Sequence, residues 1–131
     1  SLENHVEHFL KAANIPHEMQ PQIQGEPDCV IPSTAAYNDP GYPNDRLFVL
    51  GVKRTCRDRW RQVVNEGKRI QAKHIFTLEK GISGKQLVEM RDSGVTLVVP
   101  EPLHRQFPPD ERKDVVMSFE GFIHDVKNRL A

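Results

Sequence analysis

The sequence of 131 residues has little cysteine and no net charge. Its two cysteines, Cys29 and Cys56, are too few for the disulfide framework of small secreted domains. Eighteen basic and eighteen acidic residues cancel, so the overall charge predicts neither a nucleic-acid nor a membrane partner. We expect no signal peptide and no membrane-spanning segment, and therefore a protein of a reducing cytoplasm without a membrane partner.

A hydrophobic content of 37% and a charged content of 27% are typical of one globular domain. The first residues already follow a helical pattern without an initiator Met, so we expect residues 1–131 to be the C-terminal part of a longer chain. Eight of the eighteen Lys and Arg lie between Lys53 and Lys73, where only Asp58 and Glu66 are acidic. This segment is a local basic patch on a neutral protein.

Hydrophobic periodicity predicts that helices and strands alternate along most of the chain. Helices are expected at 2–14, 57–70, 83–94 and 119–130, and strands at 18–24, 28–32, 47–53, 73–78 and 95–100. The strand, helix and strand within residues 73–100 imply a parallel pair with a right-handed crossover. The element order therefore predicts an α/β fold with helices on the faces of a mixed sheet.

Lys53 ends the third predicted strand, where many metal-dependent nucleases have a lysine. The position two residues earlier on the same face usually carries a carboxylate, but here it is Gly51. Phosphodiester hydrolysis needs a divalent ion held by oxygen ligands, a positioned water and nearby positive charge. Asp28 begins the preceding strand, and antiparallel pairing of the two strands would bring Asp28 to Lys53.

Two other acids are candidates for the missing carboxylate. Glu66 lies three residues after Val63, at the edge of the packed face of the predicted helix 57–70, so it could fill the space beside Gly51. Glu3 borders the buried face of the first helix and could approach from the opposite side. The alternative is that Asp28 belongs to a turn, Lys53 reaches solvent and Glu66 pairs with Arg69 or Gln62.

These motifs resemble the catalytic domain of EcoRII-type restriction endonucleases, a branch of the PD-(D/E)xK nuclease superfamily in which the last acid has moved to a helix. The resemblance covers about residues 1–107. Its signature is a Pro-Asp pair, here ending at Asp28, then Lys53 and, after twelve residues, Glu66. It implies a restriction-endonuclease-like mixed β-sheet flanked by helices. It also implies that Glu3 is the acid of the first helix and that Tyr37 contributes a hydroxyl near the active site.

The resemblance implies Mg²⁺-dependent hydrolysis of double-stranded DNA that leaves 5′-phosphates. Asp28 and Glu66 would hold the metal with the Val52 carbonyl, while Lys53 would orient water and stabilise the developing charge. A homodimer is expected because cutting both strands of a palindrome needs two sites. A further DNA-binding domain is expected in the N-terminal part of the full-length chain.

Arg57, Asp58 and Arg59 match the positions from which this branch reads G·C pairs. Arginine bonds bidentately to guanine, and Asp accepts a hydrogen bond from cytosine N4. The resemblance thus implies a target bounded by CC and GG, similar to CCWGG or CCNGG. Arg54 and Arg61 flank the triplet and would contact phosphates.

Three alternatives stay open. A repair or modification-dependent nuclease of the same fold would cut without a CC/GG preference. A catalytically inactive DNA-binding module would bind its target without metal and cut nothing, and a structural α/β domain would show no salt-dependent DNA affinity. Trp60 is more typical of the core than of a base-stacking platform, and both cysteines are expected to be packing residues.

Overall fold

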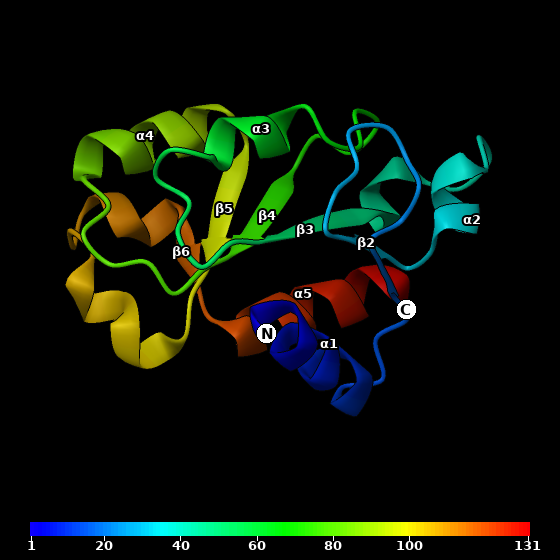
Figure 1. The fold of residues 1–131 in the computed structure, drawn as a ribbon, viewed down its shortest axis with the longest axis horizontal. Helices are drawn as coiled ribbons and strands as arrows, with labels where there is room; N and C mark the ends of the chain where they lie inside the picture. The colour runs from blue at the N-terminus through cyan, green and yellow to red at the C-terminus, as the bar shows by residue number, and fades with distance from the viewer.

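The computed structural model describes all residues 1–131, and a six-stranded sheet forms its middle layer (Figure 1). The strands lie side by side in chain order: β1 (Glu18–Met19), β2 (Cys29–Ile31), β3 (Phe48–Val52), β4 (Lys73–Phe76), β5 (Val95–Val98) and β6 (Val116–Met117). The pairs β1·β2 and β2·β3 are antiparallel, and every later pair is parallel. The predicted mixed sheet is therefore confirmed, including the parallel pair of β4 and β5.

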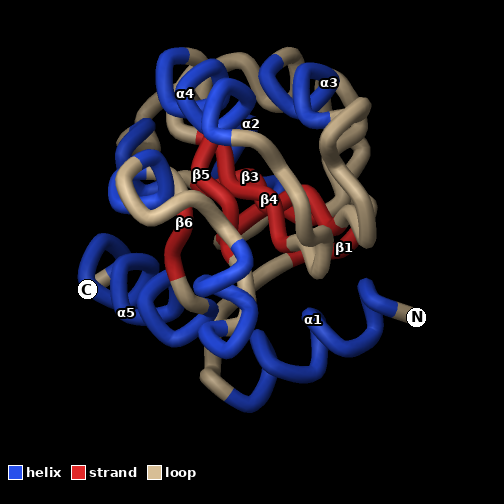
Figure 2. The backbone as a smooth tube through the Cα atoms, turned by 90° about the vertical axis from the view of Figure 1, so that its left-hand side faces the viewer, coloured by secondary structure: helices blue, strands red, loops and turns tan.

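Helices cover both faces of this sheet (Figures 1 and 2). One face carries α1 (Leu2–Ala12) and α5 (Phe119–Leu130), whereas the other carries α3 (Trp60–Val64) and α4 (Gly84–Asp92). A short helix α2 (Thr34–Asn38) and three 3₁₀ turns, η1 (Asn44–Arg46), η2 (Glu101–Gln106) and η3 (Glu111–Asp114), occupy connections. None of the helices is long and apolar enough to cross a membrane.

Two hydrophobic clusters hold the layers together. Leu10 of α1 and Phe122 of α5 pack on one face of the sheet, and Trp60 of α3 and Leu87 of α4 pack on the other. All four side chains are almost completely buried. Burying a large apolar side chain contributes about 1.5–3 kcal/mol, so these faces anchor the helices to the sheet.

The structure corrects several predicted boundaries. The helix expected over 57–70 is only α3, because Gly67 adopts a left-handed φ of 55° and the chain turns away before Ile70. The strand expected over 18–24 ends at Met19, because Gln20 also has a positive φ. The helix α2 and the two-residue strand β6 were not predicted, since neither is long enough to show a period.

His74 of β4 is a buried histidine that makes the stability of the core depend on pH. Its ring centroid lies 5.0 Å from that of Phe122 and 5.9 Å from that of Phe48. Its Nδ1 has no hydrogen-bond partner. Burial, with a smaller effect from the Arg129 charge, lowers the pKa of His74 to about 4. An unfolded histidine has a pKa near 6.5, so the unfolded chain binds this proton first and stability is lost as the pH falls from about 6.5 to 4.

We therefore expect His74→Phe to resist acid better than the wild type. Between pH 7 and pH 4, the free energy of unfolding of the wild type should fall by about 2–3 kcal/mol more than that of the variant, as urea denaturation would measure. Equal losses in the two proteins would contradict the assignment.

Candidate active site

Asp28 and Lys53 meet at the ends of β2 and β3. Cys29 pairs with Leu50 in antiparallel register, which brings the residue before β2 to the residues that end β3. Asp28 Oδ2 accepts a hydrogen bond from the Val52 amide at 2.8 Å and forms an ion pair with Lys53 Nζ at 2.9 Å. The two side chains are only 14% and 9% exposed, so water screens this ion pair weakly. The Val52 amide and the Lys53 charge thus hold the carboxylate in one orientation.

The space beside Gly51 is filled by an apolar side chain. Val52 packs in the cluster of α1 and α5, so Gly51 and Lys53 lie on the opposite side of β3, toward α3. A Cβ atom added to Gly51 would lie 3.3 Å from Val63 Cγ2 and 3.6 Å from Ile75 Cγ1. Val63 of α3 therefore packs directly against Gly51, and the role of Glu66 as the missing carboxylate stays a prediction.

Glu66 instead lies in the turn that follows α3, where the sequence predicted a helix. This residue is 7% exposed, and its Oε1 is buried without a hydrogen-bond partner. Arg69, one expected partner, donates instead to Asn44 Oδ1 and to the Tyr37, Asp39 and Tyr42 carbonyls. Glu66 is therefore a buried carboxylate that nothing in the fold neutralises by direct contact.

The electrostatics of Glu66 connect it to the Asp28–Lys53 pair. Burial raises the pKa of Glu66 to about 7, with Asp28 also raising it and the nearby charges of Lys53 and Lys73 lowering it. Two carboxylates and two ammonium groups therefore act on each other in a shielded site. A bound divalent cation would favour the charged form of Glu66 and offset the cost of its burial.

These oxygen atoms fit a hard cation such as Mg²⁺. The hydrogen bond from Val52 and the ion pair with Lys53 both involve Asp28 Oδ2, and Glu66 Oε1 has no partner. No group of three or more His, Cys, Asp or Glu side chains has the spacing of a metal site. The side chains thus supply two carboxylates, and the Val52 carbonyl and water would complete the oxygen ligands that Mg²⁺ requires.

Glu3 and Tyr37 border this site without touching Asp28. Glu3 Oε1 accepts a hydrogen bond of 2.6 Å from Gln20 Nε2, and the backbone N–H of Gln20 donates to the Asp28 backbone carbonyl at 2.8 Å. Glu3 therefore reaches the site through Gln20. Tyr37 belongs to α2, and its ring lies beside Gly67, the residue after Glu66.

Three residues that the sequence analysis missed hold the Glu66 turn. The Gln24 carbonyl accepts from the Gly67 amide at 3.0 Å, and Lys73 Nζ donates to the carbonyls of Gly67, at 2.8 Å, and Ile70. A Cβ atom on Gly25 would lie 2.7 Å from Glu66 Cα. The loop before Asp28 is thus packed directly on the turn that carries Glu66. In the sequence, the only indication of this arrangement is Lys73, a lysine at the start of a buried strand.

The Arg57-Asp58-Arg59 triplet forms the turn before α3, and not the first turn of a helix as predicted. Arg54, Arg57, Asp58 and Arg59 are exposed, and Thr55, Glu79 and the triplet line a hollow of about 510 Å³. Arg61 pairs with Glu89 at 2.7 Å and lies over the ring of Trp60. The triplet is thus presented to solvent on the side of the sheet that carries Glu66.

Trp60, Cys29 and Cys56 are core residues, as predicted. Trp60 is 2% exposed, and both cysteines are completely buried. Burial raises the pKa of Cys29 to about 12 and that of Cys56 to about 11, so neither thiol is ionised at neutral pH. They contribute packing and not nucleophilic chemistry.

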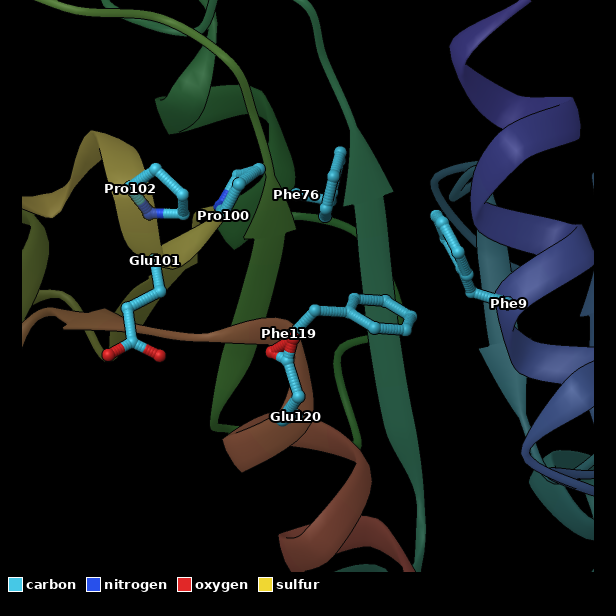
Figure 3. Close-up of a pocket in the computed structure, with 7 residues that line it drawn as sticks. All are labelled: Phe9, Phe76, Pro100, Glu101, Pro102, Phe119 and Glu120. Atoms are coloured by element: carbon cyan, nitrogen blue, oxygen red, sulfur yellow. The ribbon is translucent and has the colours of Figure 1, made fainter.

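A separate hollow of about 670 Å³ lies between α1, the end of β4 and the start of α5 (Figure 3). Phe9, Phe76 and Phe119 line it together with Pro100 and Pro102, and its charged residues are Glu101 and Glu120. An anionic phosphodiester would meet two carboxylates and no basic side chain there. This hollow is therefore a poor site for nucleic-acid chemistry.

Comparison with known proteins relates these features to one family. The family model described as EcoRII C terminal matches residues 1–123. The type II restriction enzyme EcoRII of Escherichia coli is 43% identical over 134 aligned residues, which cover 100% of this chain and 33% of the relative. The chain thus spans about a third of the length of this curated relative.

Two solved structures share the fold. Metal-depleted Ecl18kI in complex with uncleaved, modified DNA has a TM-score of 0.81 at 21% identity, covering 97% of this chain and 43% of the other. The complex of the restriction endonuclease PspGI with substrate DNA has a TM-score of 0.71 at 20% identity, covering 98% and 59%. The predicted restriction-endonuclease-like fold is therefore confirmed. Given this fold and the family match over nearly its whole length, the chain belongs to the family of the EcoRII C-terminal domain.

Proposed function

We propose that this chain is the catalytic domain of a type II restriction endonuclease. It would hydrolyse double-stranded DNA with Mg²⁺ at a site bounded by CC and GG, similar to CCWGG or CCNGG, and leave 5′-phosphates. The observation that carries the proposal is the shielded Asp28–Lys53 pair beside the buried, unpartnered carboxylate of Glu66. Family membership supports the proposal, because the relative from Escherichia coli is a type II restriction enzyme.

Each catalytic side chain would have a separate task. Asp28 and Glu66 would hold Mg²⁺ with the Val52 carbonyl, and the bound ion would supply Lewis-acid chemistry and neutralise phosphate charge. Lys53 would orient the attacking water and stabilise the negative charge that develops on phosphorus oxygens. The hydrogen bond from the Val52 amide keeps Asp28 oriented before DNA arrives, so little reorganisation is needed during the reaction.

Glu3 and Tyr37 would support this chemistry from its border. Glu3 would act through Gln20, whose amide is bonded to the Asp28 carbonyl, and so tune the position of Asp28. Tyr37 would present its hydroxyl from α2, next to the turn of Glu66.

Recognition would use the exposed turn before α3. Arg57, Asp58 and Arg59 would read G·C pairs in the major groove, while Arg54 and Arg61 would contact phosphates. A homodimer is proposed because the two strands of a palindromic target present the same bond twice. We also propose a DNA-binding domain in the N-terminal part of the full-length chain, and residence in the prokaryotic cytoplasm, where DNA is accessible.

The test is cleavage of plasmid DNA that carries CC/GG-bounded sites, with Mg²⁺ or with EDTA. Wild type should give discrete fragments with Mg²⁺ alone, and Lys53→Met should lower the rate at least about 1,000-fold, because the variant keeps the length of the side chain but loses its charge. Thermal unfolding of both proteins controls for folding.

Three results would contradict the proposal in different ways. Fragments without a CC/GG preference would indicate a repair or modification-dependent nuclease. Specific binding in EDTA without any cutting would indicate an inactive DNA-binding module. The absence of both cutting and salt-dependent DNA binding would indicate a purely structural domain.

A further inference from the structure

Glu79 lies three residues after the end of β4 and contacts the Arg57-Asp58-Arg59 turn. Its Oε1 accepts hydrogen bonds from the amides of Cys56, at 2.7 Å, and Arg57, at 2.8 Å. Its Oε2 accepts from Nε and Nη2 of Arg57, each at 3.3 Å. The Glu79 side chain is 8% exposed, whereas that of Arg57 is 49% exposed. One buried carboxylate therefore holds both the backbone and the guanidinium of the turn.

Further hydrogen bonds fix Glu79 and the turn that it holds. The Glu79 amide donates to Thr77 Oγ1 at 3.2 Å, and this hydroxyl donates to the Arg54 carbonyl at 3.1 Å. Gln86 Nε2 donates to the Arg57 carbonyl at 3.2 Å. Burial raises the pKa of Glu79, but hydrogen bonds from Cys56 and Arg57 and the charge of Arg57 outweigh it, so the pKa lies below its usual value. Glu79 is therefore an ionised, well-anchored acceptor at neutral pH.

The geometry leaves Arg57 able to read a base. A guanidinium has five N–H donors, and Glu79 takes the Nε–H and one Nη2–H. Three donors remain, and a bidentate contact to guanine O6 and N7 needs two. An Arg57 without this anchor would sample many rotamers and reach phosphates of any sequence, which contribute affinity without discrimination.

We infer that Glu79 is a positioning residue for sequence discrimination, which aims the Arg57 guanidinium at a G·C pair of the target. This inference rests on the proposed function, which gives the triplet its role in DNA recognition. The competing explanation is that Glu79 only fixes the backbone through the Cys56 and Arg57 amides.

Glu79→Gln separates these two roles. The glutamine carbonyl can still accept from the Cys56 and Arg57 amides, but its NH₂ group offers no acceptor to the guanidinium. Glu89→Gln is the matched control, because it breaks the ion pair of Arg61 on the same surface without touching the triplet. Glu79→Asp, a second variant, keeps the charge but withdraws the carboxylate by one methylene group.

The experiment compares DNA binding in EDTA, where no cleavage competes. We would measure the Kd of the protein for a CC/GG-bounded duplex and for duplexes with one outer G·C pair replaced, and take the ratio as the discrimination. Glu79→Gln should lower this ratio at least about tenfold with little change in non-specific affinity, and Glu79→Asp should lower it in part. Glu89→Gln should keep the wild-type ratio.

A double-mutant cycle decides whether Glu79 acts through Arg57. In the Arg57→Ala background, Glu79→Gln should lower the ratio no further. A wild-type ratio in Glu79→Gln, or a further loss in the double variant, would overturn the inference. If the wild type does not prefer the CC/GG-bounded duplex, both the inference and the proposed target are overturned. If the wild type prefers this duplex but shows no Mg²⁺-dependent cutting, only the proposed nuclease function is overturned.

Discussion

Replacing Glu66 with glutamine should almost abolish cleavage and, in the metal-free protein, stabilise the fold. Glutamine keeps the size of the side chain but removes the charge that would hold Mg²⁺, so we expect the cleavage rate to fall at least about 1,000-fold. The same charge is costly in the metal-free fold, because Glu66 is buried and its Oε1 has no partner. Activity and stability should therefore change in opposite directions.

The pH dependence of stability identifies the charge as the cause. Burial raises the pKa of Glu66 to about 7 in the folded state, above its ordinary value of 4.5. The folded chain thus binds this proton more tightly, and its stabilising effect, complete below pH 4.5, is lost as the pH rises through 7. In EDTA at pH 8, Glu66→Gln should exceed the wild type by about 1–2 kcal/mol in free energy of unfolding, a figure that allows for partial solvent screening. Urea denaturation at pH 8 measures both values, and a Glu66→Gln variant less stable than the wild type would contradict the prediction.

Gly25→Ala should cost about 3 kcal/mol of stability and most of the activity. Gly25 has a φ of 83°, and an added Cβ atom would lie 2.7 Å from Glu66 Cα and 2.9 Å from the Asn65 carbonyl oxygen. Backbone strain contributes about 1–2 kcal/mol and the clash a similar amount. Both contacts are backbone atoms that no rotamer change can move, so the Glu66 turn itself must shift.

Gly81→Ala is the matched control for this variant. Gly81 has a similar φ of 76°, but nothing lies within 4 Å of its added Cβ atom. It should cost only about 1 kcal/mol, from backbone strain, and leave the cleavage rate unchanged. Thermal or urea unfolding and plasmid cleavage would be measured for both variants. Equal effects of the two substitutions would show that Gly25 matters for its φ alone and not for the position of Glu66.

The sequence predicted most of the sheet because its central strands are apolar runs that periodicity detects. It also predicted the approach of Asp28 to Lys53, since antiparallel pairing of consecutive strands follows from a connecting loop. It misplaced Glu66, because the periodicity of residues 57–70 continues in the sequence past Val64 although Gly67 ends the regular structure. Periodicity reports which residues are buried, and it cannot tell a helix from a turn that buries the same side.

Contacts that support the site could not have been predicted from one sequence. Gln24 and Gly67 lie far apart in the sequence, as do Glu79 and Cys56, and neither pair shows a local spacing. Such contacts depend on the order in which β3 and β4 lie in the sheet and on the turns beside them. The sequence indicates candidate residues for the chemistry, and only the fold identifies the residues that hold these candidates in place.

The most direct test of the central claim, that Asp28 and Glu66 form one cation site, is calorimetric titration of Mg²⁺ into the protein without DNA and into its Glu66→Gln variant. Binding by wild type that disappears in Glu66→Gln, but persists in a Glu3→Gln variant, is the predicted result, because Glu3 contacts the site only through Gln20. Wild-type affinity in Glu66→Gln would contradict the claim, and the second acid of the site would have to be sought elsewhere.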